Sequence, residues 1–232
     1  MFIKKISALI LIGIAFSSNI QAEETWRITS LVWPPYSSPD LPDQGTSIKK
    51  LTELLKKENI TLIVEFYPWH RAKYLVQTNP KYLGIFPAWP EDVFNNALIS
   101  PAIDWSEIAI LKLSEQELIF DSIDNLFKEH PVGVVSIYIY PDIIENAIKK
   151  YPHNVEHAPN EYSLLMKLSK GRGLAAITDP KVMFHLAEKE GIKDLEATVL
   201  MKKELVLALR DDAENRRRMK ILIKLLKDSI DN

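Results

Sequence analysis

Cysteine is absent from this 232-residue chain, and glycine is scarce, with only seven residues. The absence of cysteine excludes disulfide bonds and zinc sites that are built from thiolates. It also leads us to expect no lipid anchor of the kind that is attached to a cysteine. With so few glycines, neither a P-loop nor a dinucleotide-binding fingerprint occurs, which argues against a phosphate-binding loop.

Long hydrophobic runs are also rare, and the main one lies at the N-terminus. Residues 6–16 form a mostly apolar stretch of about ten residues, too short to span a bilayer. It follows Lys4 and Lys5 and precedes the small residue Ala22, an order that is typical of a secretory signal peptide. We therefore expect a signal peptide over residues 1–22, cleavage near Ala22 and a periplasmic mature protein.

Neither sign of charge dominates the chain. Loss of Lys4 and Lys5 with the signal peptide lowers the basic count from 29 to 27, against 31 acidic residues, a net charge of −4. This weak acidity argues against nucleic acid as a partner. A hydrophobic content of 47% and a charged content of 26% are ordinary for a globular protein, which here could be one domain or two small lobes.

Strand and helix patterns alternate twice along the chain. In the first half the patterns predict strands over 25–33, 60–67 and 82–89, and helices over 46–59 and 68–78. After residue 131 they predict strands over 132–140, 154–158, 173–178 and 204–210, and helices over 141–151, 160–171, 179–191 and 213–230. Strands that alternate with helices indicate two α/β halves with parallel sheets.

Five stretches, in this order and spacing, resemble a known family. They are "WPPYS", "PWHRA", "ISPAIDWSEIAIL", "PVGVVSIYIY" and "LSKGRGLAAITDP". The chain resembles the periplasmic solute-binding proteins of the polar amino-acid type, family 3. This implies a two-lobed type II periplasmic binding protein fold, in which each lobe is a mostly parallel sheet flanked by helices and a ligand cleft lies between the lobes. We expect one lobe over 23–108 and 200–232, a second over 109–199, and the closing helix packed on the first lobe.

Candidate ligand-binding residues follow the predicted strands, because ligands of open α/β sheets bind at the carboxyl ends of the strands. The first lobe offers four aromatic rings and one guanidinium: Trp33, Tyr36, Trp69, Trp89 and Arg71. The resemblance implies an aromatic ligand wall at Tyr36, and in the second lobe it implies ligand contacts at Ser136, beside Tyr138, and at Asp179. Asp179 precedes Pro180 and could equally be the N-cap of a helix.

The sequence departs from the resemblance at one point that concerns the charge of the ligand. The family usually has a Thr and an Arg after its third strand, where this chain has Glu91 and Asp92. For a carboxylate-bearing ligand, Arg71 is then the best remaining partner, unless it only pairs with a local acid such as Glu65. For a cationic or neutral ligand, Asp179 with Glu91 or Asp92 would supply the polar contacts.

The resemblance implies a monomeric, non-enzymatic protein that captures a small polar organic solute, amino-acid-like or carboxylate-bearing. An ABC-type permease or a sensor receptor would read its closed state, and no cofactor or metal is expected. Two alternatives remain open: a dehydratase-like periplasmic enzyme on the same fold, and a ligand-free interaction module whose cleft is partly filled by Trp33, Trp69 and Trp89.

Overall fold

The computed structural model describes residues 24–171 and 173–229, so the predicted signal peptide lies outside the described residues. The strands of this part are β1 (Glu24–Ser30), β2 (Ile60–Phe66), β3 (Gly84–Ala88), β4 (Ala97–Ile99), β5 (Asp104–Leu113), β6 (Val132–Val135), β7 (Val155–Ala158), β8 (Ala175–Thr178) and β9 (Leu195–Arg210). The α-helices are α1 (Thr46–Lys56), α2 (Trp69–Thr78), α3 (Ile123–Glu129), α4 (Asp142–Lys150), α5 (Glu161–Ser169), α6 (Pro180–Glu190) and α7 (Ala213–Asp228).

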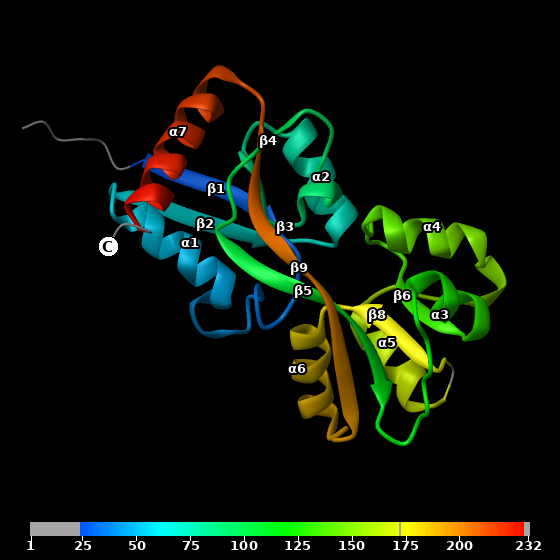
Figure 1. The fold of residues 1–232 in the computed structure, drawn as a ribbon. Coiled ribbons are helices and arrows are strands. Elements are labelled where there is room, and N and C mark those ends of the chain that lie inside the picture. The colour runs from blue at the N-terminus through cyan, green and yellow to red at the C-terminus, as the bar shows by residue number, and fades with distance from the viewer. Residues whose placement is uncertain (1–23, 172, 230–232) are drawn as a thin grey trace, which may run out of the picture.

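Two lobes share the sheet, and two long strands run from one lobe into the other (Figure 1). The order is β2-β1-β3-β9-β5-β8-β6-β7, with β4 also paired to β9. Strands β1, β2 and β3 are parallel in one lobe, and β6, β7 and β8 are parallel in the other. Between them, β5 and β9 pair antiparallel from Asp104 opposite Leu205 to Leu113 opposite Leu195. These two strands form the connection between the lobes, and the predicted lobe boundaries fall within them.

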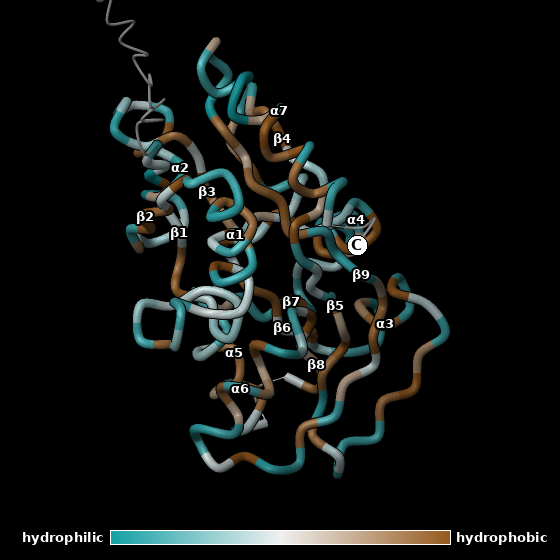
Figure 2. The backbone as a smooth tube through the Cα atoms, turned by 90° about the vertical axis from the view of Figure 1, so that its left-hand side faces the viewer, coloured by the Kyte–Doolittle hydropathy of each residue, from teal (hydrophilic) through white to brown (hydrophobic). Residues whose placement is uncertain are grey.

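Helices cover both faces of each parallel sheet. Apolar residues of α1 and α7 pack with β1 in one cluster, while α2 packs on the opposite face of the same sheet. In the second lobe α5 and α6 cover one face, and α3 and α4 cover the other. Figure 2 shows hydrophobic and hydrophilic residues alternating along α1 and α7, as expected for helices with one buried and one exposed face.

The closing helix packs on the N-terminal lobe, as the sequence predicts. Met219, Leu222 and Leu226 of α7 lie in the same cluster as Trp26 and Ile28 of β1. Their removal from water is the main contribution that holds α7 in place.

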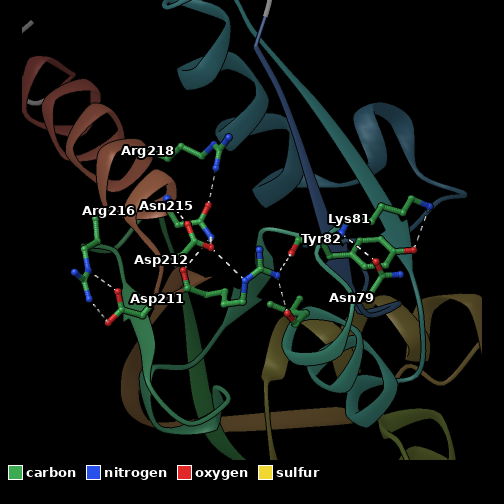
Figure 3. A network of polar contacts seen from close by, with 10 residues as sticks. Asn79, Lys81, Tyr82, Asp211, Asp212, Asn215, Arg216 and Arg218 are labelled. Carbon is green, nitrogen blue, oxygen red and sulfur yellow. Dashed lines mark hydrogen bonds and ion pairs between the residues drawn. The ribbon is translucent and has the colours of Figure 1, made fainter.

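A polar network fixes the return of the chain from β9 to α7 (Figure 3). Arg210 Nη1 donates to the carbonyl oxygens of Val76 at 3.2 Å and Tyr82 at 3.0 Å, which ties the end of β9 to α2 and the approach to β3. Asp212 caps α7 by accepting from the backbone N–H of Asn215 at 2.8 Å. Asn215 in turn donates to the carbonyl oxygen of Arg210 at 2.9 Å.

Some elements differ from the sequence prediction. Strand β6 ends at Val135 and not near residue 140, because a turn follows in which the Tyr138 N–H donates to the Val135 carbonyl at 3.3 Å. The Tyr140 hydroxyl then accepts from the Val135 N–H at 3.0 Å, which closes the turn. Strand β9 begins at Leu195, nine residues before the predicted start, because its polar N-terminal part gains its partners from β5. Within residues 24–171 and 173–229, no helix is long and apolar enough to cross a membrane.

Candidate functional site

Aromatic and acidic side chains gather where the parallel strands of both lobes end. Each lobe turns the carboxyl ends of its three parallel strands toward the junction, the position at which open α/β sheets bind ligands. The side chains that follow these strand ends are Trp33 and Tyr36 after β1, Trp69 after β2, Trp89 after β3, Tyr138 and Tyr140 after β6, Glu161 after β7, and Asp179 after β8.

A tight turn holds the first two rings together. The Tyr36 and Ser37 N–H groups both donate to the Trp33 carbonyl at 3.0 Å, and the Trp33 N–H donates to the Ser37 carbonyl. The two rings pack against each other at a tilt of 32°, with centroids 4.6 Å apart. Gly45 packs beneath the turn with φ of 105°, where an added Cβ would lie 2.5 Å from the Tyr36 carbonyl oxygen. This position therefore requires glycine if the turn is to keep its place.

The rings of the two lobes form one continuous cluster. Trp89 meets Trp33 edge-on at 6.1 Å within the first lobe. Across the junction it contacts Tyr138 at 5.2 Å and Tyr140 at 6.4 Å, and its indole N–H donates to the Ser106 hydroxyl at 2.9 Å. Trp89 therefore stands at the centre of the contact between the lobes.

Two hydrogen bonds join the lobes beside these rings. The Trp33 indole N–H donates to Glu161 at 2.7 Å, and the Tyr36 hydroxyl donates to Asp179 at 2.9 Å. The Tyr138 hydroxyl donates to the same oxygen of Glu161 as Trp33 does. Both carboxylates lie in the second lobe, and both donor rings belong to the turn that follows β1 in the first lobe. The structure is thus closed, with rings of one lobe bound to acids of the other.

Burial raises the pKa of the acids in this junction. For Asp179 it raises the pKa to about 6, although the N–H groups of Val182 and Glu107 and the Tyr36 hydroxyl stabilise the charged form. Burial also raises the pKa of Glu161, against hydrogen bonds from Tyr138 and Trp33. The structure shows no ion pair between either carboxylate and a described basic side chain.

Asp92 is the third buried acid near the junction, and it differs because a lysine pairs with it. Lys73 Nζ lies 2.5 Å from its carboxylate, and the Trp69 indole N–H donates to it at 2.8 Å. Burial nevertheless raises the pKa of Asp92. Glu91, its neighbour, forms an ion pair with Lys203.

Two hollows lie in the junction. The inner cavity has a volume of about 20 Å³, room for one water molecule, and is lined by Leu31, Trp33, Trp69, Pro87, Trp89, Asp92 and Tyr138. The outer groove has a volume of about 450 Å³ and is lined by Leu31, Val32, Phe66, Tyr67, Pro68, Trp69, His70, Ile137, Tyr138, Pro159, Asn160 and Glu161. Leu31, Trp69 and Tyr138 border both, so the two hollows adjoin each other.

The structure brings together six of the eight predicted site residues: Trp33, Tyr36, Trp69, Trp89, Tyr138 and Asp179. Asp179 is also the N-cap of α6, so both roles considered from the sequence are compatible. Ser136 is exposed, and its backbone N–H donates to Ala158. Arg71 is exposed on α2 with its guanidinium 5.4 Å from the Tyr67 ring centroid, beside the groove but not among its lining residues.

Sequence reasoning missed Glu161 as a site residue. It follows β7 as Asp179 follows β8, so the rule of strand carboxyl ends could have found it. The N-cap Asn160, which precedes it, made the segment read as an ordinary helix start. Among the described residues, no three His, Asp or Glu side chains gather as a metal-binding group.

The fold has many solved counterparts of low sequence identity. An ancestral arginine-binding protein bound to arginine superposes with a TM-score of 0.71 at 16% identity, over 90% of this chain and 93% of that one. A histidine kinase sensor domain with similarity to periplasmic binding proteins gives 0.71 at 13% identity, over 88% and 90%. The fold is that of the type II periplasmic binding proteins.

A third counterpart with this fold is described as the precursor of an enzyme. An ancestral amino-acid-binding protein, described as a precursor of cyclohexadienyl dehydratase, gives a TM-score of 0.65 at 19% identity, over 90% of each chain. No family model and no curated protein matches the sequence. The likeness therefore shows the fold, and function has to be argued from the site.

Proposed function

We propose that the protein captures a small polar organic solute between its lobes and releases it unchanged. The observation that carries this proposal is the ring cluster and hydrogen-bond pair that join the lobes, from Trp33 and Tyr36 to Glu161 and Asp179. A solute in the groove contacts Tyr138 and Glu161, which also take part in the contact between the lobes. Binding and lobe closure are therefore coupled, as in hinged binding proteins.

The partner in this proposal is a membrane protein that recognises the closed form, either an ABC-type permease or a sensor receptor. The counterparts support both kinds of role, since one binds arginine and another is a kinase sensor domain. The periplasmic location rests on the charged, apolar and small-residue order of residues 1–22. N-terminal sequencing of protein purified from cells should find a start near Glu23, and an intact Met1 would contradict export.

A thermal-shift screen followed by calorimetry tests the binding role. Amino acids and small amines that bind should raise the melting temperature in a saturable way, with the solute recovered intact by chromatography. Trp69→Ala, which removes a wall shared by both hollows, should weaken binding, whereas Trp105→Ala at an exposed ring of β5 should not. Equal losses in both variants would mean that the junction is not the binding site.

A second candidate is an enzyme on the same fold, and a specific observation favours it. Burial raises the pKa of Asp179 to about 6, so part of its carboxyl is protonated near neutral pH, although Asp179 lines neither hollow and a substrate would have to open the junction to reach it. One counterpart is described as a precursor of cyclohexadienyl dehydratase. Incubation with a cyclohexadienyl acid, followed by ultraviolet detection of an aromatic product, decides this. Product formed by the wild type and not by Asp179→Asn would replace the binding proposal with an enzymatic one.

A ligand-free interaction module is the remaining alternative. The small inner cavity favours it, because Trp33, Trp69 and Trp89 are buried and the cavity that they line has a volume of only about 20 Å³. In that case no small molecule would shift the melting temperature, and small-angle scattering would show one compact state under all conditions. A binding protein should instead show a more open average shape that contracts when solute is added.

A further inference from the structure

The three buried acids of the junction differ in how their charge is compensated. Asp92 has the Lys73 ammonium at 2.5 Å. Asp179 is fully buried, caps α6, accepts three hydrogen bonds from Tyr36, Glu107 and Val182, and lies outside the linings of both hollows. Its acceptor capacity is largely used within the protein.

Glu161 is the exception among these acids. It is 6% exposed, and both of its side-chain hydrogen bonds, from Trp33 and Tyr138, go to one oxygen, Oε1. The backbone N–H of Glu161 itself and the dipole of α5, in whose first turn it lies, supply part of the compensation. None of the described basic side chains pairs with it, and it borders the groove of about 450 Å³.

The groove offers aromatic rings, and His70 is the one basic side chain among its lining residues. Its volume falls in the range of small-molecule pockets, and Phe66, Tyr67, Trp69 and Tyr138 supply aromatic walls. Neither lysine nor arginine lines it. The Arg71 guanidinium lies over the Tyr67 ring and is not among the lining groups. A carboxylate entering this groove would meet Glu161 with no lysine or arginine to pair with and only His70 as a basic side chain, whereas a cation would meet a buried carboxylate and ring faces.

We propose that the groove between α2 and α5 takes an organic cation without a carboxylate, with its charged group against Glu161 and its apolar part against Trp69 and Tyr138. This inference rests on the proposed solute-binding function. Ion pairing would relieve the cost of burying Glu161, and the ring walls would add cation–π and apolar contacts. The ligand class is thus an amine, a quaternary ammonium compound or a guanidine.

Matched pairs of probes test the class. Agmatine and cadaverine are arginine and lysine without the carboxylate, and choline is a quaternary cation. Calorimetry on the exported protein should show at least one of the three binding, with agmatine or cadaverine at least about tenfold tighter than its parent amino acid. Glu161→Gln keeps the shape and an acceptor oxygen for Trp33, and should weaken binding of the cation at least about 30-fold.

Controls keep this test apart from a failure of folding or of the binding role itself. Glu156→Gln removes an exposed charge from the same lobe and should bind as the wild type does. Thermal unfolding should find Glu161→Gln at least as stable as the wild type, because the substitution removes a buried charge. Tighter binding of arginine or lysine, or unchanged affinity in Glu161→Gln, would overturn the inference and leave the solute-binding function standing. If neither these cations nor any amino acid binds, both proposals fail.

Discussion

The two faces of the interlobe junction are chemically opposite. The N-terminal lobe presents rings whose polar atoms donate, the Trp33 indole and the Tyr36 hydroxyl, while the second lobe presents the acceptors Glu161 and Asp179. These donors and acceptors form their hydrogen bonds only when the two lobes are correctly aligned. The difference shows how two lobes of the same α/β architecture can form a junction that closes in one arrangement, since Trp33 and Tyr36 find these acceptors only in the other lobe.

The largest effect should come from removing the ring at the centre of the junction. Trp89 is buried and contacts Trp33, Tyr138 and Tyr140, so Trp89→Ala should lower the free energy of unfolding by about 3–5 kcal/mol. Trp105→Ala, at a ring that is 48% exposed, is the matched control and should cost less than about 1 kcal/mol. Urea unfolding measures both. Similar losses would mean that the two faces are not joined through Trp89.

The acceptor face should make stability depend on pH. Burial raises the pKa of Asp179 to about 6, above its ordinary value of 3.8. Between these values the native state binds more protons than the unfolded state, so the free energy of unfolding should fall as pH rises from about 4 to 6. The titration of Asp179 should account for about 2–3 kcal/mol of this fall in the free energy of unfolding. Burial of Glu161 and Asp92 raises their pKa as well and acts in the same direction.

Urea unfolding at several pH values between 4.5 and 7.5 measures this slope. Asp179→Asn keeps a good helix cap and removes the titrating group, so the slope should become shallower without vanishing. Glu65 acts oppositely only at lower pH, because hydrogen bonds from Lys81 and Tyr82 hold its pKa at about 2. The same slope in variant and wild type would contradict the assignment to Asp179.

A double-mutant cycle should measure one donor–acceptor pair by itself. Tyr36→Phe removes the hydroxyl and Asp179→Asn removes the charge, and their coupling energy should be about 1.5 kcal/mol, as for a buried hydrogen bond to a charged group. Thermal or urea unfolding of the four proteins provides the cycle. Additive effects, with no coupling, would show that the lobes do not meet through this pair in solution.

The smallest expected effect concerns Arg71 and decides the charge of the ligand independently. For a cation held by Glu161, Arg71→Ala should change the dissociation constant by less than about twofold, because the guanidinium lies outside the groove lining. For a carboxylate-bearing solute held by Arg71, the same change should cost about 2–4 kcal/mol of binding free energy, and Arg71→Lys should already weaken binding. Calorimetry with one bound solute distinguishes the two.

Much of the fold follows from the sequence because its signals are local. Strand and helix alternation predicts both parallel sheets, and the apolar spacing of Met219, Leu222 and Leu226 predicts the buried face of α7. The position of Trp33, Tyr36, Trp69 and Trp89 at the junction follows from the strand ends that precede them. Strand β4 has three residues and gains its partner only from β9, so its own sequence gives little signal.

The polar part of the site was harder to predict. Which donor meets which acceptor depends on how the lobes align, and no local pattern encodes the pairing of Trp33 with Glu161. The placement of Arg71 could have been predicted, since Trp69, Ala72 and Val76 define the buried face of α2 and Arg71 lies about 200° around the helix from Trp69. Helix phase was therefore available evidence that Arg71 faces outward.

The crystal structure of the protein with the small molecule that co-purifies from the periplasm, identified by mass spectrometry, tests the central claim most directly. The account predicts an unmodified solute between the lobes, in contact with Trp69 and Tyr138 and with its polar group toward Glu161. A molecule bound elsewhere, or a junction still filled by Trp33 and Trp89 with no solute at saturating concentration, would contradict it.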